Sequence, residues 1–351
     1  MCGHGRSRPF GRRVIGPGPL ARLDALPRCR LGLLPTPLTP ARRLGASAGV
    51  PDLWLKRDDL LGFGFGSHKV RALELLIADA LARKADVLVT GAGPQSNHVR
   101  ATAAAAAHAG LELQAIYWGR PPARASGNLA LAKLLGARCS FTGEDDRSSV
   151  DRGIEAAAAA LASEGHRPYA IPRGGACSLG TLGHALAARE LTEQARRLGA
   201  EPDTVVLAAG SGATLAGLLL GRALVGARWR IEAVSVSRAA ADVRRNVRVL
   251  AAGAASLLGM AGAVDDAEVA VHDGFIGPGY GVPSPDGIAA IRLAARTEGV
   301  FLDPTYTAKA FAWVISAARG GRFLAGERVV FLHTGGEPAL FADPEALLAG
   351  A

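Results

Sequence analysis

The residue best placed to do chemistry is a lysine that follows a glycine-rich loop. Gly62, Gly64 and Gly66 precede Lys69, and Ser67 occupies the position expected for a helix N-cap. The apolar spacing after Lys69 predicts an amphipathic helix, so the lysine lies at the positive end of the helix dipole. A positive charge there is unfavourable unless an anion lies nearby. The pattern therefore indicates a lysine with an anionic partner, although a solvated lysine in a first helical turn has the same spacing.

The turn Gly210-Ser211-Gly212-Ala213-Thr214 separates a predicted strand from a predicted helix. Its glycines expose backbone N–H groups, Ser and Thr add hydroxyls, and the helix N-terminus favours an anion. The turn is not a P-loop, because no Gly-Lys-Ser/Thr follows, and its glycine spacing does not match the dinucleotide-binding pattern. It is therefore either a phosphate site or an ordinary tight turn.

A third polar group, Gln95-Ser96-Asn97-His98, opens another predicted helix. A single Ser or Asn cap would satisfy that helix, so four polar residues in a row exceed what capping needs. His98 considered by itself is more typical of a surface or packing residue. The group as a whole indicates a binding site at the start of the helix.

Short apolar runs alternate with longer helical patterns along the chain, which predicts an α/β protein with mainly parallel sheets and helices on both faces. In such sheets, ligands bind beyond the carboxyl ends of the strands. The polar turns follow predicted strands, so we expect them to meet at one cleft. These turns are 91–98, 174–178, 210–214 and 333–336. The expected strands are 53–57, 87–90, 113–118, 138–141, 204–209, 231–236 and 328–332, and the clearest helices are 150–164, 239–258, 286–298 and 307–319.

Length and composition exclude several classes of protein. A chain of 351 residues suggests two compact units. Hydrophobic residues make up 49% of it, but no apolar run is long enough for a membrane span. The four cysteines form no C-x-x-C pair and the eight histidines form no metal-binding pattern. We therefore expect reduced thiols in a cytoplasmic protein and no metal site.

The net charge of +9 is concentrated at one end of the chain. Residues 1–50 contain nine arginines and one acid, a net +8, which leaves +1 for the other 301 residues. Residues 1–30 are therefore predicted to be a flexible basic arm or an over-long assigned start. A nucleic-acid binder acting through this arm is a remaining alternative, although the rest of the chain has no basic face.

The motifs together resemble the type II pyridoxal-phosphate enzymes, and within them the D-cysteine desulfhydrase / 1-aminocyclopropane-1-carboxylate deaminase family. The similarity covers roughly residues 31–342. The motifs that carry it are Leu55-Lys56-Arg57-Asp58-Asp59-Leu60, Gly66-Ser67-His68-Lys69, Gln95-Ser96-Asn97-His98-Val99-Arg100, Gly210-Ser211-Gly212-Ala213-Thr214, Gly279-Tyr280-Gly281, Asp303-Pro304-Thr305-Tyr306-Thr307 and His333-Thr334-Gly335-Gly336.

The resemblance implies two domains with pyridoxal 5'-phosphate in the cleft between them. The larger domain is expected to contain 31–66 plus 166–345, and the smaller one 67–165. Lys69 would bind the cofactor covalently. The other implied cofactor contacts are Asn97 at the phenolic oxygen, Gly210, Ser211, Gly212, Ala213 and Thr214 at the phosphate, and Thr334 at the pyridine nitrogen.

The implied reaction is β-elimination or deamination of a small amino acid, with D-cysteine giving pyruvate, ammonia and sulfide. The freed Lys69 would act as the base on the α-hydrogen. The implied catalytic residues are Lys69, Ser96, Tyr280 and Tyr306, and the implied substrate contacts are Ser96, His98 and Thr307. A homodimer is also implied.

Two positions depart from the family pattern. His68 replaces the asparagine that usually precedes the lysine, and a titratable ring there could alter the lysine's pKa. Thr307 stands where the ring-opening deaminases have a glutamate, which favours the desulfhydrase reaction. The alternatives that remain are aminocyclopropane-carboxylate deamination, a cysteate sulfo-lyase, and a pseudo-enzyme that binds the cofactor without turnover.

Overall fold

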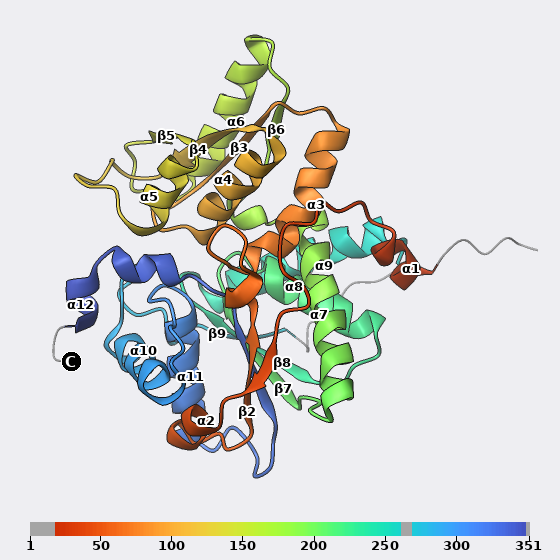
Figure 1. Ribbon diagram of the computed structural model, residues 1–351, viewed down its shortest axis with the longest axis vertical. Coiled ribbons are helices and arrows are strands. Elements are labelled where there is room, and N and C mark those ends of the chain that lie inside the picture. The colour runs from red at the N-terminus through yellow and green to blue at the C-terminus, as the bar shows by residue number, and fades with distance from the viewer. Residues whose placement is uncertain (1–17, 261–268, 349–351) are drawn as a thin grey trace, which may run out of the picture.

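The computed structural model describes residues 18–260 and 269–348, which fold into two units, each built on a mainly parallel β-sheet (Figure 1). The predicted α/β class with mainly parallel sheets is confirmed. The smaller unit lies above the larger one in Figure 1, and helix α3, Lys69–Ala82, runs between them. No helix in the described ranges is long and apolar enough to cross a membrane.

Six strands form the sheet of the larger unit, in the order β1-β2-β10-β7-β8-β9. Neighbouring strands are parallel except β1 and β2, which pair antiparallel at one edge. The strands are β1 Leu38–Pro40, β2 Leu53–Arg57, β7 Thr204–Ala209, β8 Arg230–Ser235, β9 Ala270–His272 and β10 Val329–His333.

Helices cover both faces of this sheet, which is why its central strands are continuous apolar runs. In β7, Val205 and Leu207 belong to the core under α7, α8 and α9, whereas Val206 belongs to the core under α2, α10 and α11. Figure 1 shows these two helical layers on opposite sides of the strands. The helices are α2 Arg42–Ala48, α7 Ser178–Leu198, α8 Ala213–Leu224, α9 Ala240–Leu257, α10 Pro285–Glu298 and α11 Thr307–Arg319, with α12 Pro344–Leu348 at the end of the described chain.

The smaller unit has four parallel strands in the order β5-β4-β3-β6. Helices α3, α4 and α5 pack on one face, and α6 packs on the other through Val150 and Ile154. The elements are α3 Lys69–Ala82, β3 Val87–Ala92, α4 Asn97–Ala109, β4 Glu112–Tyr117, α5 Gly127–Leu134, β5 Arg138–Phe141, α6 Ser149–Ser163 and β6 Pro168–Ala170.

Helix α3 also packs against α7 of the larger unit, and a glycine permits the close crossing. A Cβ atom at Gly183 would lie 2.2 Å from the backbone oxygen of Arg71. Any larger residue at 183 would therefore push the two helices apart. The crossing fixes the position of α3, and with it Lys69, relative to the larger sheet.

The predicted flexible arm is wrong for the part of residues 1–30 that the structure describes. Helix α1, Pro19–Asp24, places Leu23 in a buried cluster with Leu75, Leu182 and Leu258. Arg22 also donates a hydrogen bond to the Leu258 carbonyl at 3.0 Å. One buried leucine among arginines is too weak a pattern to detect in the sequence. Residues 1–17 of the predicted arm lie outside the described residues.

The predicted domain boundary at 165/166 lies too early in the chain. Strand β6 pairs with β3 between Pro168 and Ala170, so these residues belong to the smaller sheet. The chain returns to the larger unit only after this strand. β1, β6 and β9 were not predicted as strands, because three-residue strands are too short to show a period-2 pattern.

Leu23→Ala is expected to lower the free energy of unfolding by about 2 to 4 kcal/mol, because it leaves a cavity in a packed cluster. Chemical denaturation followed by circular dichroism measures this change. Leu20→Ala is the matched control, because Leu20 lies on the same helix and is 36% exposed. Equal, small losses for both variants would contradict the packing of α1.

Candidate active site

A cavity opens between the two units, beyond the carboxyl ends of β3, β4, β7, β8 and β10. The structure brings most of the predicted site residues to its wall, and they come from both units. Those on the wall are Lys69, Ser96, Asn97, His98, Gly210, Ser211, Gly212, Thr214, Tyr280, Tyr306 and Thr334. Ala213 and Thr307 are not among the lining residues.

The glycine loop holds the start of α3 close to other backbone. Gly66 has φ +70°, and a Cβ there would lie 2.1 Å from the backbone oxygen of Asp59. Ser67 has φ +116° and does not act as the N-cap, which is His68. Instead the Ser67 hydroxyl accepts a hydrogen bond from the Lys69 N–H at 3.3 Å. The predicted N-cap is thus wrong by one residue, while the predicted placement of Lys69 in the first turn is right.

A buried network of charges anchors the other side of this turn. Arg71 donates to the Asp58 carboxylate at 2.7 and 2.8 Å and to Glu190 of α7 at 2.9 Å. Burial alone would raise the pKa of Asp58, but the adjacent Arg71 guanidinium outweighs it and holds that pKa well below its usual range. Lys56 donates to the same Glu190 carboxylate at 2.5 Å. The network joins β2, α3 and α7 two residues from Lys69.

Among the described residues, the Lys69 side chain has no carboxylate partner. Its Nζ donates a hydrogen bond to the Gly174 carbonyl at 3.1 Å and faces the cavity. Burial lowers the pKa of Lys69 to about 8, from 10.5 for an ordinary lysine. A neutral, nucleophilic amine is therefore accessible near physiological pH.

The glycine turn after β7 forms an anion cradle at the start of α8. Gly212 is the N-cap with φ +94°, and the first N–H groups of the helix point to the cavity end of the turn. The hydroxyls of Ser211 and Thr214 have no hydrogen-bond partner in the described part of the chain, and both residues line the cavity. The cradle therefore has free donors for a phosphate.

A chain of hydrogen bonds orients Asn97. Arg100 Nε donates to the Asn128 side-chain oxygen at 2.8 Å, so the Asn128 amide nitrogen faces Asn97 and donates to its oxygen at 2.9 Å. Because the Asn97 oxygen faces Asn128, its amide nitrogen is directed away from Asn128 and is a donor at the cavity wall. Arg100 also donates to the carbonyls of Gly64 and Gly66, so it fixes Asn97 and the glycine loop together.

Two tyrosines close the cavity on the side of the larger unit. The hydroxyl oxygens of Tyr280 and Tyr306 lie 2.5 Å apart. Burial raises the pKa of both hydroxyls, so each remains protonated and one can donate to the other. Lys309 holds the Tyr280 loop by donating to the carbonyls of Ile276 and Gly279 at 2.7 and 2.6 Å.

Comparison with known families decides the identity of the cofactor. Residues 29–335 match the model of the family described as "Pyridoxal-phosphate dependent enzyme". The chain belongs to this family. The predicted family, cofactor and enzymatic nature are thereby confirmed.

Individual relatives agree over nearly the whole chain. A "Putative 1-aminocyclopropane-1-carboxylate deaminase" from Pyrococcus abyssi is 39% identical, covering 93% of this chain and 97% of the relative. A "D-cysteine desulfhydrase" from Klebsiella pneumoniae is 38% identical, covering 92% and 98%. A crystal structure of an "ACC deaminase homologue" has a TM-score of 0.87 and 35% identity, covering 95% and 99%. A fungal L-serine ammonia-lyase from Rhizomucor miehei, at 18% identity and TM-score 0.62 over 87% of this chain and 94% of that one, shares the fold.

The cavity fits pyridoxal phosphate by the chemistry of its donors. Lys69 would supply the amine, the cradle at 210–214 would supply amides and hydroxyls for the phosphate, and the Asn97 amide would supply a donor for the phenolic oxygen. The Thr334 hydroxyl also has no partner in the described chain and would meet the ring nitrogen. A neutral hydroxyl there leaves that nitrogen largely unprotonated.

His68 lies behind the lysine and carries no charge. Its Nδ1 contacts the Thr334 carbonyl at 3.1 Å, so that nitrogen carries the hydrogen and donates it. Burial, followed by the nearby Lys69 charge, lowers the pKa of His68 to about 3. The departure from the family pattern therefore adds a neutral donor to the backbone of the Thr334 turn and leaves the ring uncharged at neutral pH.

The predicted substrate contacts differ in what they offer to a ligand. Ser96 caps α4, and its hydroxyl accepts from the Val99 N–H at 3.3 Å. His98 contacts the Thr90 hydroxyl at 3.0 Å, and burial lowers its pKa to about 3, so it offers no positive charge. Thr307 is fully buried and bonds to Asp303 at 2.8 Å, so the structure does not bring it to the cavity. Its contribution is to position the neighbouring Tyr306.

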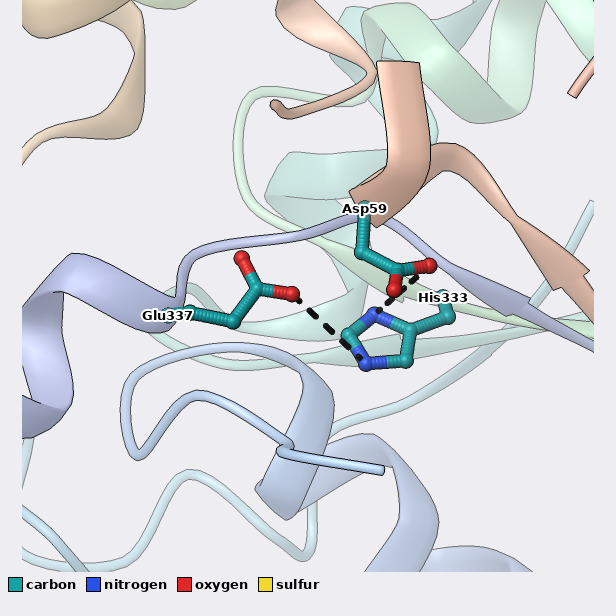
Figure 2. A group of neighbouring side chains, drawn as sticks. All are labelled: Asp59, His333 and Glu337. Carbon is teal, nitrogen blue, oxygen red and sulfur yellow. Dashed lines mark ion pairs between the residues drawn. The ribbon is translucent and has the colours of Figure 1, made fainter. Parts of the chain in front are cut away.

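One cluster in the described ranges has ligand atoms close enough together for a metal: Asp59, His333 and Glu337. Figure 2 shows the two carboxylates beside the His333 ring, each 3.9 Å from one ring nitrogen. Nδ1 accepts from the Gly335 N–H at 3.2 Å, and Nε2 contacts the Phe301 carbonyl at 3.0 Å. Both ring nitrogens are therefore already used. We infer that the cluster holds the 333–336 turn in place.

Sequence reasoning missed several residues of this site. Arg100 and Asn128 orient Asn97, and three arginines at positions 147, 173 and 238 line the cavity. Arg100 lies two residues after the polar group at 95–98, so its place in the sequence could have identified it as a site residue. The others come from separate loops with no shared motif, and the sequence contains no signal that joins them.

Asn128→Asp is expected to weaken cofactor binding about 10-fold, because aspartate still accepts from Arg100 but cannot donate to Asn97. Equilibrium dialysis of pyridoxal phosphate measures the dissociation constant. Gln114→Glu is a matched amide-to-acid control away from the cavity, where the side chain bonds to Ser140. Unchanged affinity in Asn128→Asp would contradict the proposed orientation of Asn97.

The rate at which the cofactor attaches to the apoprotein is expected to rise with pH through a midpoint near 8, because the attacking group is the neutral Lys69 amine. The neutral form is present above the pKa, so attachment is slow below the midpoint and levels off above it. Stopped-flow absorbance follows the reaction. A lysine model compound measured in parallel corrects for titration of the cofactor itself, and a midpoint near 10 would contradict the effect of burial.

Proposed function

We propose that this protein catalyses β-elimination from a small amino acid, of the type in which D-cysteine gives pyruvate, ammonia and sulfide. The observation that carries the proposal is that Lys69, whose neutral form is accessible, and the Tyr280–Tyr306 hydroxyl pair line the same cavity. Lys69 can accept a proton, and the tyrosine pair can donate one. β-Elimination needs both transfers.

The residues have separate tasks in this proposal. When bound, pyridoxal phosphate withdraws electrons from the α-carbon of the substrate. Lys69 takes the α-proton, and the released electron pair forms the Cα–Cβ double bond as the Cβ substituent leaves. Tyr280 or Tyr306 donates a proton to the departing group. Water then converts the released product into a 2-oxo acid and ammonia.

The start of α4 is the proposed site for the substrate carboxylate. Ser96, Asn97 and His98 at the start of the helix line the cavity, and the helix dipole favours an anion there. His98 contributes a neutral ring on the same wall. The carboxylate would thus be held by hydrogen bonds without a paired cation.

The position of Thr307 supports elimination over opening of a cyclopropane ring. No carboxylate side chain lines the cavity within the described residues, and Thr307 itself is turned into the protein. The named relatives include both a D-cysteine desulfhydrase and a putative aminocyclopropane-carboxylate deaminase. Sequence similarity therefore does not distinguish the two reactions, and the preference rests on the residues of the site.

A substrate panel tests the proposal. D-cysteine, L-cysteate and aminocyclopropane carboxylate are offered to the holoenzyme, and the 2-oxo acid is measured for each. We expect product from a substrate with a leaving group on Cβ. Turnover of aminocyclopropane carboxylate alone would overturn the preferred reaction. A coloured, borohydride-reducible protein that is inactive on every amino acid would support the pseudo-enzyme alternative.

We also propose a cytoplasmic homodimer, on the resemblance to the family. The cysteine usage supports the compartment, since the three described cysteines are free. Analytical ultracentrifugation of the full chain tests the assembly. A single species at the monomer mass would remove this part of the proposal.

A further inference from the structure

The cavity has three arginines whose charge the proposed reaction does not use. Arg147 lies before α6 in the smaller unit, Arg173 lies in the crossing segment, and Arg238 follows β8 in the larger unit. All three line the cavity. Burial, and then the charges of the other two arginines, lower the pKa of Arg238. Like charges gathered in this way are unfavourable unless an anion joins them.

Among the described residues, nearby carboxylates neutralise only part of this charge, because Asp151 pairs with Arg173 alone. Arg173 donates from Nε and one terminal nitrogen to Asp151, at 2.7 and 2.6 Å, and its other terminal nitrogen has no partner within residues 18–260 and 269–348. Asp242 is paired with Arg245. The Arg238 guanidinium has no hydrogen bond or ion pair within the described chain. Its five N–H donors are therefore available to a ligand.

Arg147 places this charge beside the reacting end of the cavity. Its guanidinium lies 5.1 Å from the centre of the Tyr280 ring and 5.6 Å from that of Trp118. The Tyr280 hydroxyl contacts the Tyr306 hydroxyl, and these two groups are the pair proposed to protonate the leaving group. Arg147 also contacts the Ser237 carbonyl at 3.5 Å, so it spans from the smaller unit to the residue before Arg238.

Arg173 lies on the lysine side of the same space. The next residue, Gly174, supplies the carbonyl that accepts from Lys69. A ligand between the three arginines would therefore be close to both proton-transfer groups. The start of α4, proposed for the substrate carboxylate, lies on the wall of the smaller unit and contains no arginine that lines the cavity.

We propose that Arg147, Arg173 and Arg238 form a subsite for a second anionic group, carried on Cβ of the substrate, such as a sulfonate. This inference rests on the proposed β-elimination and narrows its substrate class. A guanidinium binds such oxyanions through paired N–H groups. Amino acids with an anionic Cβ substituent would therefore be preferred over D-cysteine and β-chloroalanine, whose substituents are neutral.

The step is balanced without an added oxidant or reductant. The Cα–H bond breaks and its proton goes to Lys69, while the electron pair forms the Cα–Cβ double bond. The Cβ–sulfur bond breaks and its pair leaves with sulfur as sulfite. Addition of water gives pyruvate and ammonia. The departing sulfur takes a proton from the Tyr280–Tyr306 pair and is released as hydrogensulfite. The arginines hold the sulfonate before the step and this oxyanion after it.

The test compares matched substrates on Arg238→Gln, Arg147→Gln and wild-type holoenzyme. Arg238→Gln removes a side chain with no partner in the described chain, so the fold is expected to survive. We expect kcat/KM for L- or D-cysteate to fall about 10- to 100-fold, and that for β-chloroalanine to change less than about threefold. Arg124→Gln, at an exposed position away from the cavity, is the control.

Binding without turnover gives a second readout. Calorimetry of cysteate on the cofactor-loaded Lys69→Ala protein, with and without Arg238→Gln, is expected to show a loss of affinity of similar size. Equal losses for cysteate and β-chloroalanine, or no loss for either, would overturn the proposal.

The cofactor phosphate is the other anion that these arginines could hold. A raised dissociation constant for pyridoxal phosphate in Arg238→Gln, with an unchanged ratio between the two substrates, would assign them to the cofactor and overturn the proposal. Efficient turnover of β-chloroalanine or D-cysteine with poor turnover of cysteate by wild type would also overturn it, yet leave β-elimination standing. No turnover of any amino acid would contradict the proposed function itself.

Discussion

Lys69→Ala is expected to remove covalent cofactor attachment and to lower turnover by roughly 1,000-fold or more, because one side chain supplies both the amine and the base. Its Nζ is the only lysine nitrogen among the residues that line the cavity in the described chain. Loss of the imine absorbance band, and of borohydride trapping, reports the attachment. The steady-state rate of 2-oxo acid release measures the loss of turnover that follows from removing the base.

Lys133→Ala is the control for this variant. Lys133 is exposed near the end of α5 and does not line the cavity. It should retain the band and the activity. An imine band that survives in Lys69→Ala would show that another amine attaches the cofactor and would contradict the assignment.

Removal of either hydroxyl of the tyrosine pair is expected to lower kcat by about 100- to 1,000-fold, through lost proton transfer to the leaving group. The oxygens of Tyr280 and Tyr306 lie 2.5 Å apart and act on one proton, so Tyr280→Phe and Tyr306→Phe should be strongly non-additive. The double variant is expected to be about as slow as the slower single one. Steady-state kinetics with a common substrate measures all three.

Tyr169→Phe provides the matched control for the tyrosine pair. The Tyr169 hydroxyl bonds to Asp79 at 2.7 Å, on α3 and away from the cavity. This variant should keep its turnover. If the effects of the two active-site variants multiply, the hydroxyls act independently and the shared-proton role is wrong.

The rigidity of this pair explains why a small change should be costly. The Asp303 carboxylate accepts from the N–H groups of Thr305, Tyr306 and Thr307, which fixes the start of α11. Lys309 on the same helix holds the Tyr280 loop. Asp303, just before α11, thus fixes Tyr306, and Lys309 on α11 fixes the loop of Tyr280. No loop movement is needed to bring the two hydroxyls together.

Residues whose proposed role depends on nearby backbone could be picked out from the sequence, and the structure brings them to the cavity. Lys69, the 210–214 turn and the 95–98 turn each combine glycines or caps with polar groups inside one short segment, so the local pattern contains most of their function. The alternation of strands and helices likewise predicts that these turns meet at one edge of the sheets. Those predictions depend on local geometry and on the handed topology of parallel strands.

Residues whose role depends on distant partners were not predictable. Thr307 was expected to touch the substrate, but Asp303 draws it into the protein. Leu23 was assigned to a flexible arm, but Leu75, Leu182 and Leu258 bury it. In both cases the deciding contacts lie on another face or another element, and a sequence pattern does not record them.

The sequence by itself therefore determined the fold class and pointed to Lys69 and the 210–214 turn, because these depend on chain-local conformation and periodicity. Only the tertiary structure decided that His68 is neutral, that Asn128 directs Asn97, and that three arginines from separate loops share one cavity. Burial and charge proximity are properties of positions in space. They set the electrostatics of the site, and with it the kind of substrate that we expect this enzyme to accept.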